Sequence, residues 1–536
     1  MALLERTITL SIDGYDYVAG VSDDLYIFRN IPYAKLERFS DGGYNIFGQP
    51  IDIEPEDCMD LPPEKSRTTV NTTAPGPMAL QTLRTVKAYI SPQCQNFNIW
   101  VPARIFDQRE KAPVLFYVHG GSFKSGSNQN PELDGKDLAR AQQIIVVEPN
   151  FRIGPAGFIN FSGLDSRCGS NMAFHDILSA LRWVQRHIGA FGGDPGNVTL
   201  MGESAGGTIV SIFPFLEEAS GMFSKLVIFS GIPSAFTPPE AHDYRAARFV
   251  EFVGAENVQE LFQPHMWQKI ADAANPFTEA INFGAATYMP TVDNDLIRDN
   301  AVCMMYKAAQ AGKTLDIPVW SNMTEDELSI MAVMPRIFGR WGMDNLMDQA
   351  YVEEGHHQVG TMRQIYQETY GANRASQVYS DMIIRSVLIW YMQFASQCTN
   401  AYFTRLDWKS PMQKLTGLGA FHSSDLYIVF NSLDNLTGRA FFKGLGAKSA
   451  GRNQLVEHMQ ADLGRFMREG KLNGPDRRQE LMPFDPDENL LKAYDVPCRM
   501  ETVWLEELDH AWKQTKYYKI VLDEGREETI KNLKLD

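Results

Sequence analysis

The sequence predicts an α/β protein built around one mainly parallel central sheet. Short apolar strands alternate with amphipathic helical segments along 536 residues, and no internal repeat or low-complexity linker interrupts them. The strands are continuous apolar runs, as expected where helices cover both faces of a parallel sheet. We therefore expect one domain over residues 1–536, with helices flanking the sheet.

The first expected element is a small antiparallel sheet within residues 7–33, where β-prone segments flank an Asp-Gly turn. The parallel strands follow at 114–118, 144–147, 198–201, 226–229, 317–320 and 402–406. Helical insertions are predicted at about 232–312 and about 330–400. They should wall a cleft at the carboxyl ends of the strands, where open α/β sheets bind ligands.

Composition and charge disfavour several classes of partner. A hydrophobic content of 44% and a charged content of 22% are typical of a globular protein with a large core. The formal net charge of -16 repels phosphate backbones and anionic lipid headgroups, so we expect neither nucleic acid nor a membrane surface as partner. The segment Ile383–Phe394 is too short to span a bilayer and is expected to be a core helix. A neutral or cationic small molecule suits this charge better.

The six cysteines are dispersed, without a C-x-x-C pair or metal-ligand spacing, so we expect no metal and no other cofactor. Buried free thiols in a reducing compartment are favoured over a disulfide framework. The segment Met1–Arg6 lacks a basic stretch followed by an apolar run. Together these features predict a cytoplasmic protein.

Ser204 is the candidate nucleophile. The strand Asn197–Met201 runs into Gly202-Glu203-Ser204-Ala205-Gly206-Gly207, and a helix-compatible segment follows. Small residues on both sides let the backbone turn sharply and lift the serine into the cleft, as in a nucleophile elbow. The G-x-S-x-G pattern alone is weak, and its place between a buried strand and a helix makes it informative.

A serine hydroxyl needs a base to take its proton, and ten histidines are available. In α/β enzymes with such an elbow the order along the chain is nucleophile, acid, base, which removes the histidines before Ser204. His422 follows the strand at 402–406 and a glycine-rich segment, so it is the first choice. His510 follows a plausible late strand and is the rival. The others are expected on the surface, on a helix face or in the insertion.

The acid should follow the strand at 317–320. The loop after it offers Glu325, Asp326 and Glu327, which spacing alone does not distinguish. One of the three must turn inward to accept the imidazole N–H and stabilise the imidazolium.

These residues resemble the type-B carboxylesterases, the family of the cholinesterases within the α/β-hydrolase fold. Phe191–Gly207 is similar to the family signature almost residue for residue. The resemblance covers nearly the whole chain except about the last thirty residues. Supporting matches are Ile31–Ala34, Asn98–Pro102, Asn150–Pro155, Gly419–Leu426 and Phe466–Gly470.

The resemblance implies roles for individual residues. The family's acid-Glu pair falls on Asp326-Glu327, which implies Glu327 as the acid, and the family's histidine loop implies His422 as the base. The glycine-rich loop after the strand at 114–118 implies an oxyanion hole made by the backbone N–H groups of Gly121, Ser122 and Ala205. His119 is then not the base, although it stands three residues from Ser122.

Two departures from the family matter. Ser122 stands where a third glycine is usual, which restricts the backbone and adds a hydroxyl near the carbonyl site. Met78 stands where secreted members have the partner of the cysteine that corresponds to Cys94, so no disulfide is expected there. Glu203 either favours a cationic imidazolium or substrate, or holds local structure. Ser230, in Phe229-Ser230-Gly231, is a candidate supporting residue of the site.

The function that follows is a serine carboxylic-ester hydrolase. It would cleave small-molecule esters through an acyl-enzyme intermediate with a Ser-His-Glu triad. The same triad serves an amidase, a carbamate hydrolase or an acyltransferase, and a non-catalytic binding protein of the same family is a further alternative. We expect a monomer or homodimer.

Overall fold

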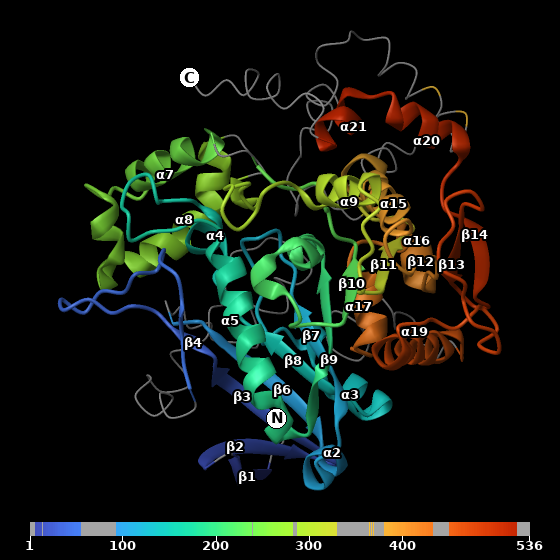
Figure 1. Ribbon diagram of the computed structural model, residues 1–536, viewed down its shortest axis with the longest axis horizontal. Helices are drawn as coiled ribbons and strands as arrows, with labels where there is room; N and C mark the ends of the chain where they lie inside the picture. The colour runs from blue at the N-terminus through green and yellow to red at the C-terminus, as the bar shows by residue number, and fades with distance from the viewer. Residues whose placement is uncertain are drawn as a thin grey trace.

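The computed structural model describes residues 6–12, 14–54, 93–237, 240–281, 287–329, 364, 366, 368, 380–432 and 450–522. Within this part of the chain twelve strands form one sheet in the order β1-β2-β3-β6-β8-β7-β9-β10-β11-β12-β13-β14 (Figure 1). A second sheet pairs only β4 (Ala34–Lys35) with β5 (Ile51–Asp52).

The centre of the large sheet is parallel, as predicted. Its pairs β8–β7, β7–β9, β9–β10, β10–β11, β11–β12 and β12–β13 are all parallel. The strands are β7 (Ala112–Val118), β8 (Ile145–Pro149), β9 (Gly193–Glu203), β10 (Lys225–Phe229), β11 (Val319–Thr324), β12 (Ala401–Leu406) and β13 (Leu490–Tyr494).

The antiparallel opening is also present, and the structure places it at one edge of the main sheet. β1 (Arg6–Ile12), β2 (Tyr15–Ser22) and β3 (Leu25–Pro32) pair antiparallel in sequence, and β3 pairs with β6 (Asn96–Pro102). β6 then joins β8 antiparallel. β14 (Arg499–Thr502) forms the opposite edge. The sheet is therefore continuous from the first described strand to the last.

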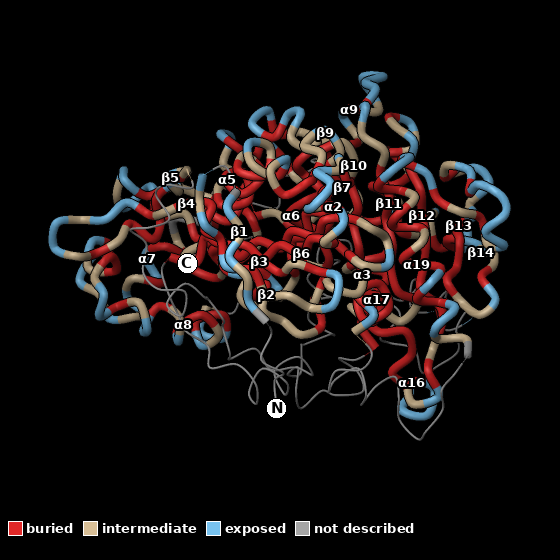
Figure 2. The backbone as a smooth tube through the Cα atoms, turned by 90° about the horizontal axis from the view of Figure 1, so that it is seen from below, coloured by how far each residue is buried: buried red, intermediate tan, exposed pale blue. Residues whose placement is uncertain are grey.

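Helices cover both faces of the sheet, so two apolar cores form. β7 shows how: Val114, Phe116 and Val118 belong to one core, and Leu115 and Tyr117 belong to the other. The first core is covered mainly by α5 (Met172–His187), α9 (Ala301–Gln310) and α15 (Ser386–Ala395); the second by α3 (Lys136–Gln142), α17 (Ser424–Val429) and α19 (Ala450–Glu469). In Figure 2 the central strands are buried and the exposed segments lie at the periphery. This explains the uninterrupted apolar runs.

The first predicted insertion contains helices. Residues 232–312 hold α7 (Glu240–Phe252), α8 (Trp267–Ala280) and α9. Most of residues 330–400 lie outside the described residues, but their last part contains α15, the expected core helix. No helix of the described residues is long and apolar enough to cross a membrane. That these insertions wall a cleft, and that residues 1–536 form one domain, stay predictions.

A buried ion pair fixes the turn after β8. The Arg152 guanidinium donates from Nε and Nη2 to the two carboxylate oxygens of Asp176 on α5, at 2.9 and 2.7 Å. The Arg152 backbone N–H also donates to this carboxylate, and Nη1 donates to the carbonyls of Ile46 and Gly48. Both side chains are almost fully buried, so each charge depends on the other.

We predict that Asp176→Asn destabilises the protein strongly, because it leaves the Arg152 charge buried without its counterion. The free energy of unfolding should fall by about 3–5 kcal/mol in urea denaturation. Glu110→Gln is the matched control, since the Arg104–Glu110 pair is exposed and should contribute about 1 kcal/mol or less. Equal losses for both variants would contradict the prediction.

Candidate active site

Ser204 occupies a strained turn between β9 and α6 (Ala205–Ser211). Its backbone has φ 55° and ψ -122°, a conformation that residues other than glycine rarely adopt. Gly202 and Gly206, on either side of this turn, have no room for a side chain. A Cβ on Gly202 would stand 2.3 Å from the Gly206 carbonyl oxygen, and one on Gly206 would stand 2.1 Å from the Val118 carbonyl oxygen. The spacing that singled out Ser204 is therefore the spacing that this turn needs.

The structure brings the predicted serine, histidine and glutamate together. His422 Nε2 lies 2.8 Å from Ser204 Oγ, and His422 Nδ1 lies 2.6 Å from Glu327 Oε2. Two backbone bonds join the acid loop to the histidine loop: Asp326 N–H to the Ala420 carbonyl at 3.0 Å and His422 N–H to the Glu327 carbonyl at 2.9 Å. The relative position of base and acid is thus set by main-chain contacts.

Glu327 is the carboxylate that turns inward. It is completely buried, and its Oε1 accepts the Ser230 hydroxyl at 2.7 Å and the Thr324 backbone N–H at 2.8 Å. With Oε2 on His422, both oxygens of Glu327 are held. Ser230, expected only as a supporting residue of the site, therefore contacts Glu327.

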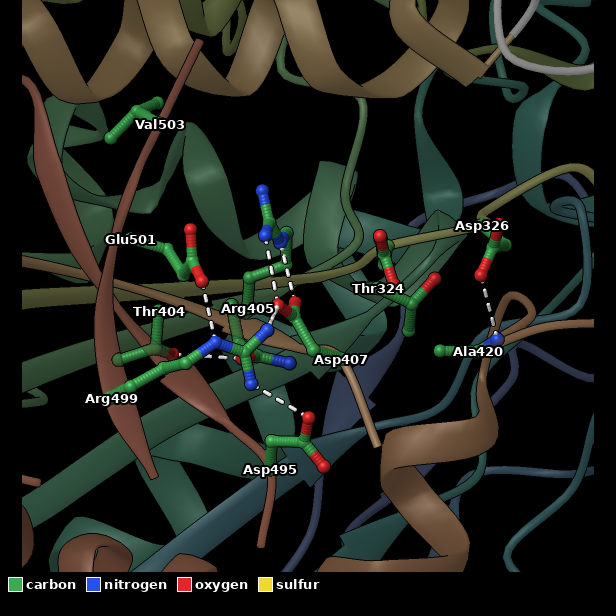
Figure 3. Close-up of polar contacts among 12 residues, drawn as sticks. Thr324, Asp326, Thr404, Arg405, Asp407, Ala420, Asp495, Arg499, Glu501 and Val503 are labelled. Atoms are coloured by element: carbon green, nitrogen blue, oxygen red, sulfur yellow. Dashed lines mark hydrogen bonds and ion pairs between the residues drawn. The ribbon is translucent and has the colours of Figure 1, made fainter. Parts of the chain in front are cut away.

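The two other acids of the loop serve structure. Asp326 accepts the Ala420 backbone N–H at 3.0 Å, and Figure 3 shows its side chain pointing toward that residue. Lys409 pairs with both Asp326 and Glu325 at 2.7 Å. These contacts fasten the acid loop to the histidine loop, and they leave Glu327 to contact the imidazole.

The rival histidines are placed elsewhere. His510 is exposed on α20 (Glu506–Lys513), and His458 lies on α19 with Nδ1 3.1 Å from Cys498 Sγ. His119 stacks on Phe151 with ring centroids 4.4 Å apart, and burial lowers its pKa to about 4. His175 and His187 lie on α5, and His265 is largely exposed. The His242 side chain, His356 and His357 lie outside the described residues.

Acidic groups gather around His422. Burial by itself would lower its pKa, but the hydrogen bond and charge of Glu327, with the charges of Glu203 and Asp425, raise the pKa to about 9. Burial likewise raises the pKa of Glu203 and raises that of Asp425 to about 8. Negative groups in a poorly solvated site thus favour the imidazolium, the species that forms when the base takes a proton.

The contacts of Glu203 fit both roles that the sequence left open. Its Oε1 accepts the Ser423 hydroxyl at 2.5 Å, which fixes the residue after the histidine. The same oxygen lies 3.5 Å from His422 Nε2, close enough to stabilise a positive charge there. Asp425 completes the cluster through Oδ2, which accepts the Asn322 amide at 2.7 Å. Its role was not predicted, because Asp425 joins these groups only through the orientation of α17.

The glycine-rich loop after β7 has an unusual backbone. Gly121, Ser122 and Phe123 have φ of 120°, 52° and 62°, three consecutive positive values. Gly121 has no alternative, because a Cβ there would stand 2.1 Å from the Ser125 carbonyl oxygen. Ser122 is exposed and adopts the left-handed conformation at a cost that glycine would avoid. Ala205, the third predicted donor residue, begins α6.

Comparisons with known proteins point to one family. A family model described as the carboxylesterase family matches residues 59–512. The para-nitrobenzyl esterase of Bacillus subtilis is 28% identical over 436 residues, which span 79% of this chain and 83% of that protein. The mouse cholinesterase is 28% identical over 386 residues, 64% of this chain and 60% of its own. The bovine bile salt-activated lipase is 29% identical over 318 residues, 56% of this chain and 51% of its own.

Solved structures share the fold. A thermophilic PNB esterase has a TM-score of 0.75 at 22% identity, and the match covers 94% of this chain and 99% of that one. A carboxylesterase of Geobacillus stearothermophilus has a TM-score of 0.75 at 23% identity, with the same coverage. The predicted α/β-hydrolase fold is thereby confirmed.

We predict that Glu327→Gln lowers the pKa of His422, because the imidazolium loses a negative partner while burial continues to disfavour it. A fall of roughly two units is expected in an NMR titration of the labelled imidazole. Glu325→Gln is the control, since Glu325 contacts Lys409 and not the ring. An unchanged His422 pKa in Glu327→Gln would show that this carboxylate does not act on the ring.

Proposed function

The chain belongs to the carboxylesterase family and hydrolyses carboxylic esters, and from that premise we propose that Ser204, His422 and Glu327 are its catalytic triad. Two contacts of His422 carry the proposal. Its Nε2 lies 2.8 Å from Ser204 Oγ, and its Nδ1 lies 2.6 Å from Glu327 Oε2. Nucleophile, base and orienting acid are within hydrogen-bond reach of one another, the arrangement that serine acyl transfer needs.

In the proposed cycle Ser204 Oγ attacks the ester carbonyl while His422 Nε2 takes its proton. The tetrahedral intermediate collapses when the imidazolium returns this proton to the alcohol oxygen, and the alcohol leaves an acyl-enzyme. Water then attacks the acyl carbon, His422 again takes and returns the proton, and the acid is released. Glu327 keeps the Nδ1–H oriented and stabilises the imidazolium in both halves.

The oxyanion of each intermediate would be bound by the backbone N–H groups of Gly121, Ser122 and Ala205. Fixed main-chain donors need no reorganisation during the reaction, and one such donor is typically worth about 3–4 kcal/mol. The three consecutive positive φ values of the loop support this assignment, since they are a strained arrangement of successive backbone amides.

The substrates proposed are small-molecule carboxylic esters with neutral or cationic groups. The net charge of -16 disfavours anionic substrates, and acidic side chains, Glu203 and Glu327, contact the base at the site itself. Hydrolysis of amides or carbamates and acyl transfer use the same triad, and no observation favours them. The cytoplasmic location and the monomeric or dimeric state stay predictions.

We predict that Ser204→Ala lowers kcat/KM for short-chain aryl esters by at least about a thousandfold, because no nucleophile remains for acyl transfer. Covalent labelling by an organophosphonate should be lost as well. Ser220→Ala, which removes an exposed serine, should retain both properties. Undiminished hydrolysis or labelling in Ser204→Ala would refute the assignment of the nucleophile.

Ser122 is expected to affect which esters are accepted. Ser122→Gly relieves the left-handed conformation of a side-chain-bearing residue and removes a hydroxyl beside the proposed oxyanion site. The ratio of kcat/KM between a bulky and a small acyl ester should change by roughly three- to tenfold. Ser122→Ala separates the hydroxyl from the backbone effect. If neither variant changes the ratio, Ser122 does not determine acyl preference.

A further inference from the structure

A row of buried polar side chains crosses the α17 and α19 face of the sheet at the level of the nucleophile. Glu148 on β8 lies beside Tyr117 on β7, because Val147 pairs with Phe116 and both next residues point to the same face. Tyr117 pairs with Met201, and Glu203 follows two residues later on the same face of β9. The row thus runs from Glu148 through Tyr117 to the active site.

Two members of this row are buried with unused hydrogen-bonding groups. Glu148 and Tyr117 are each 1% exposed. The two carboxyl oxygens of Glu148 have no hydrogen-bond partner among the described residues, and the same is true of the Tyr117 hydroxyl. Burying such a group without a partner costs roughly 1–3 kcal/mol. Sites of this kind in proteins are normally satisfied by ordered water that bridges neighbouring polar groups.

The charges around Tyr117 show where its hydroxyl lies. Burial raises the pKa of Tyr117 well above its usual range, and the charges of Glu203, Glu148 and Asp425 raise it further. The hydroxyl is therefore within electrostatic reach of acids on both sides of β7. Glu203 Oε2 lies close to the chain just after β7, since it would stand 2.7 Å from a Cβ on Gly120.

The surroundings of Glu148 favour its neutral carboxyl form. Burial raises its pKa well above its usual range, Asp134 raises it further, and Arg29 opposes the rise. Burial thus favours the protonated carboxyl group, which can donate one hydrogen bond. The Tyr117 phenol can donate one as well. Tyr117 lies between Glu148 and Glu203 in the strand register of β8, β7 and β9.

We propose that ordered water connects Glu148 to Tyr117 and Tyr117 to Glu203, and that Tyr117 and Glu148 are positioning residues that keep Glu203 ionised beside His422. Donors directed at a carboxylate favour its charged form. The ionised Glu203, with Glu327 and Asp425, in turn favours the imidazolium. The inference rests on the proposed function, because it assigns to these residues an effect on the catalytic base.

Loss of a donor to Glu203 is expected to lower the pKa of His422. Removing a donor makes Glu203 harder to ionise, so His422 loses negative charge nearby and its pKa falls. The enzyme then reaches its neutral-imidazole form at lower pH. The ascending limb of kcat/KM against pH therefore moves to lower pH in Tyr117→Phe, in the same direction as in Glu203→Gln.

The test is the pH profile of ester hydrolysis for four single variants and one double variant. Tyr117→Phe and Glu148→Met should shift the ascending limb down by roughly half a pH unit, less than Glu203→Gln, which removes the charge itself. Glu148→Gln retains a donor of the same shape and should match the parent. Tyr117→Phe added to Glu203→Gln should cause no further shift, because both act through one group.

An infrared measurement tests the protonation of Glu148 without relying on activity. The carbonyl stretch of protonated carboxyl groups in the parent at neutral pH should lose one component in Glu148→Gln, while the component of Asp425, whose pKa is also raised, should remain. Thermal unfolding of each variant checks that it is folded. Unchanged profiles in Tyr117→Phe and Glu148→Met, a shift to higher pH, or equal shifts in Glu148→Gln and Glu148→Met would overturn the proposal. Absence of esterase activity in the parent would instead refute the proposed function.

Discussion

The strained turn at Ser204 is the constraint on which the rest of the site depends. A serine at φ 55° is held there because β9 lies between β7 and β10, and because the Ser204 N–H donates to the Phe229 carbonyl at 2.9 Å. Gly202 and Gly206 allow the strand and α6 to approach closely enough. The strands on both sides of β9 thus hold Ser204 in its strained conformation at the carboxyl edge of the sheet.

The second requirement is charge that is buried but compensated. Glu327 holds its position through Ser230 and the Thr324 N–H, and its other oxygen contacts the imidazole. The base therefore lies in a field that stabilises its protonated form without bulk water. Away from the site, Arg152 and Asp176 form another buried pair of opposite charges. The hydrogen bonds that Arg152 donates to Asp176 fix the loop after β8. At both places the buried charge has a partner of opposite sign.

Much of this arrangement could be predicted from the sequence because it is local. The apolar runs of β7 to β12 indicated a sheet covered on both faces, and the glycines around Ser204 indicated its turn. The choice among Glu325, Asp326 and Glu327 was not local, since all three share one loop. It was first made through family resemblance, and the structure gives its physical reason: Asp326 and Glu325 contact Lys409, and Glu327 turns inward.

The sequence by itself determined the fold class and the candidate nucleophile, because strand patterns and turn residues are read over a few neighbouring positions. Only the tertiary structure decided that Asp425 and Glu203 share the surroundings of His422, and that Glu148 and Tyr117 are buried beside them. These groups come from separate strands and from α17. Their proximity depends on strand order and register, and no local pattern in a single sequence records either.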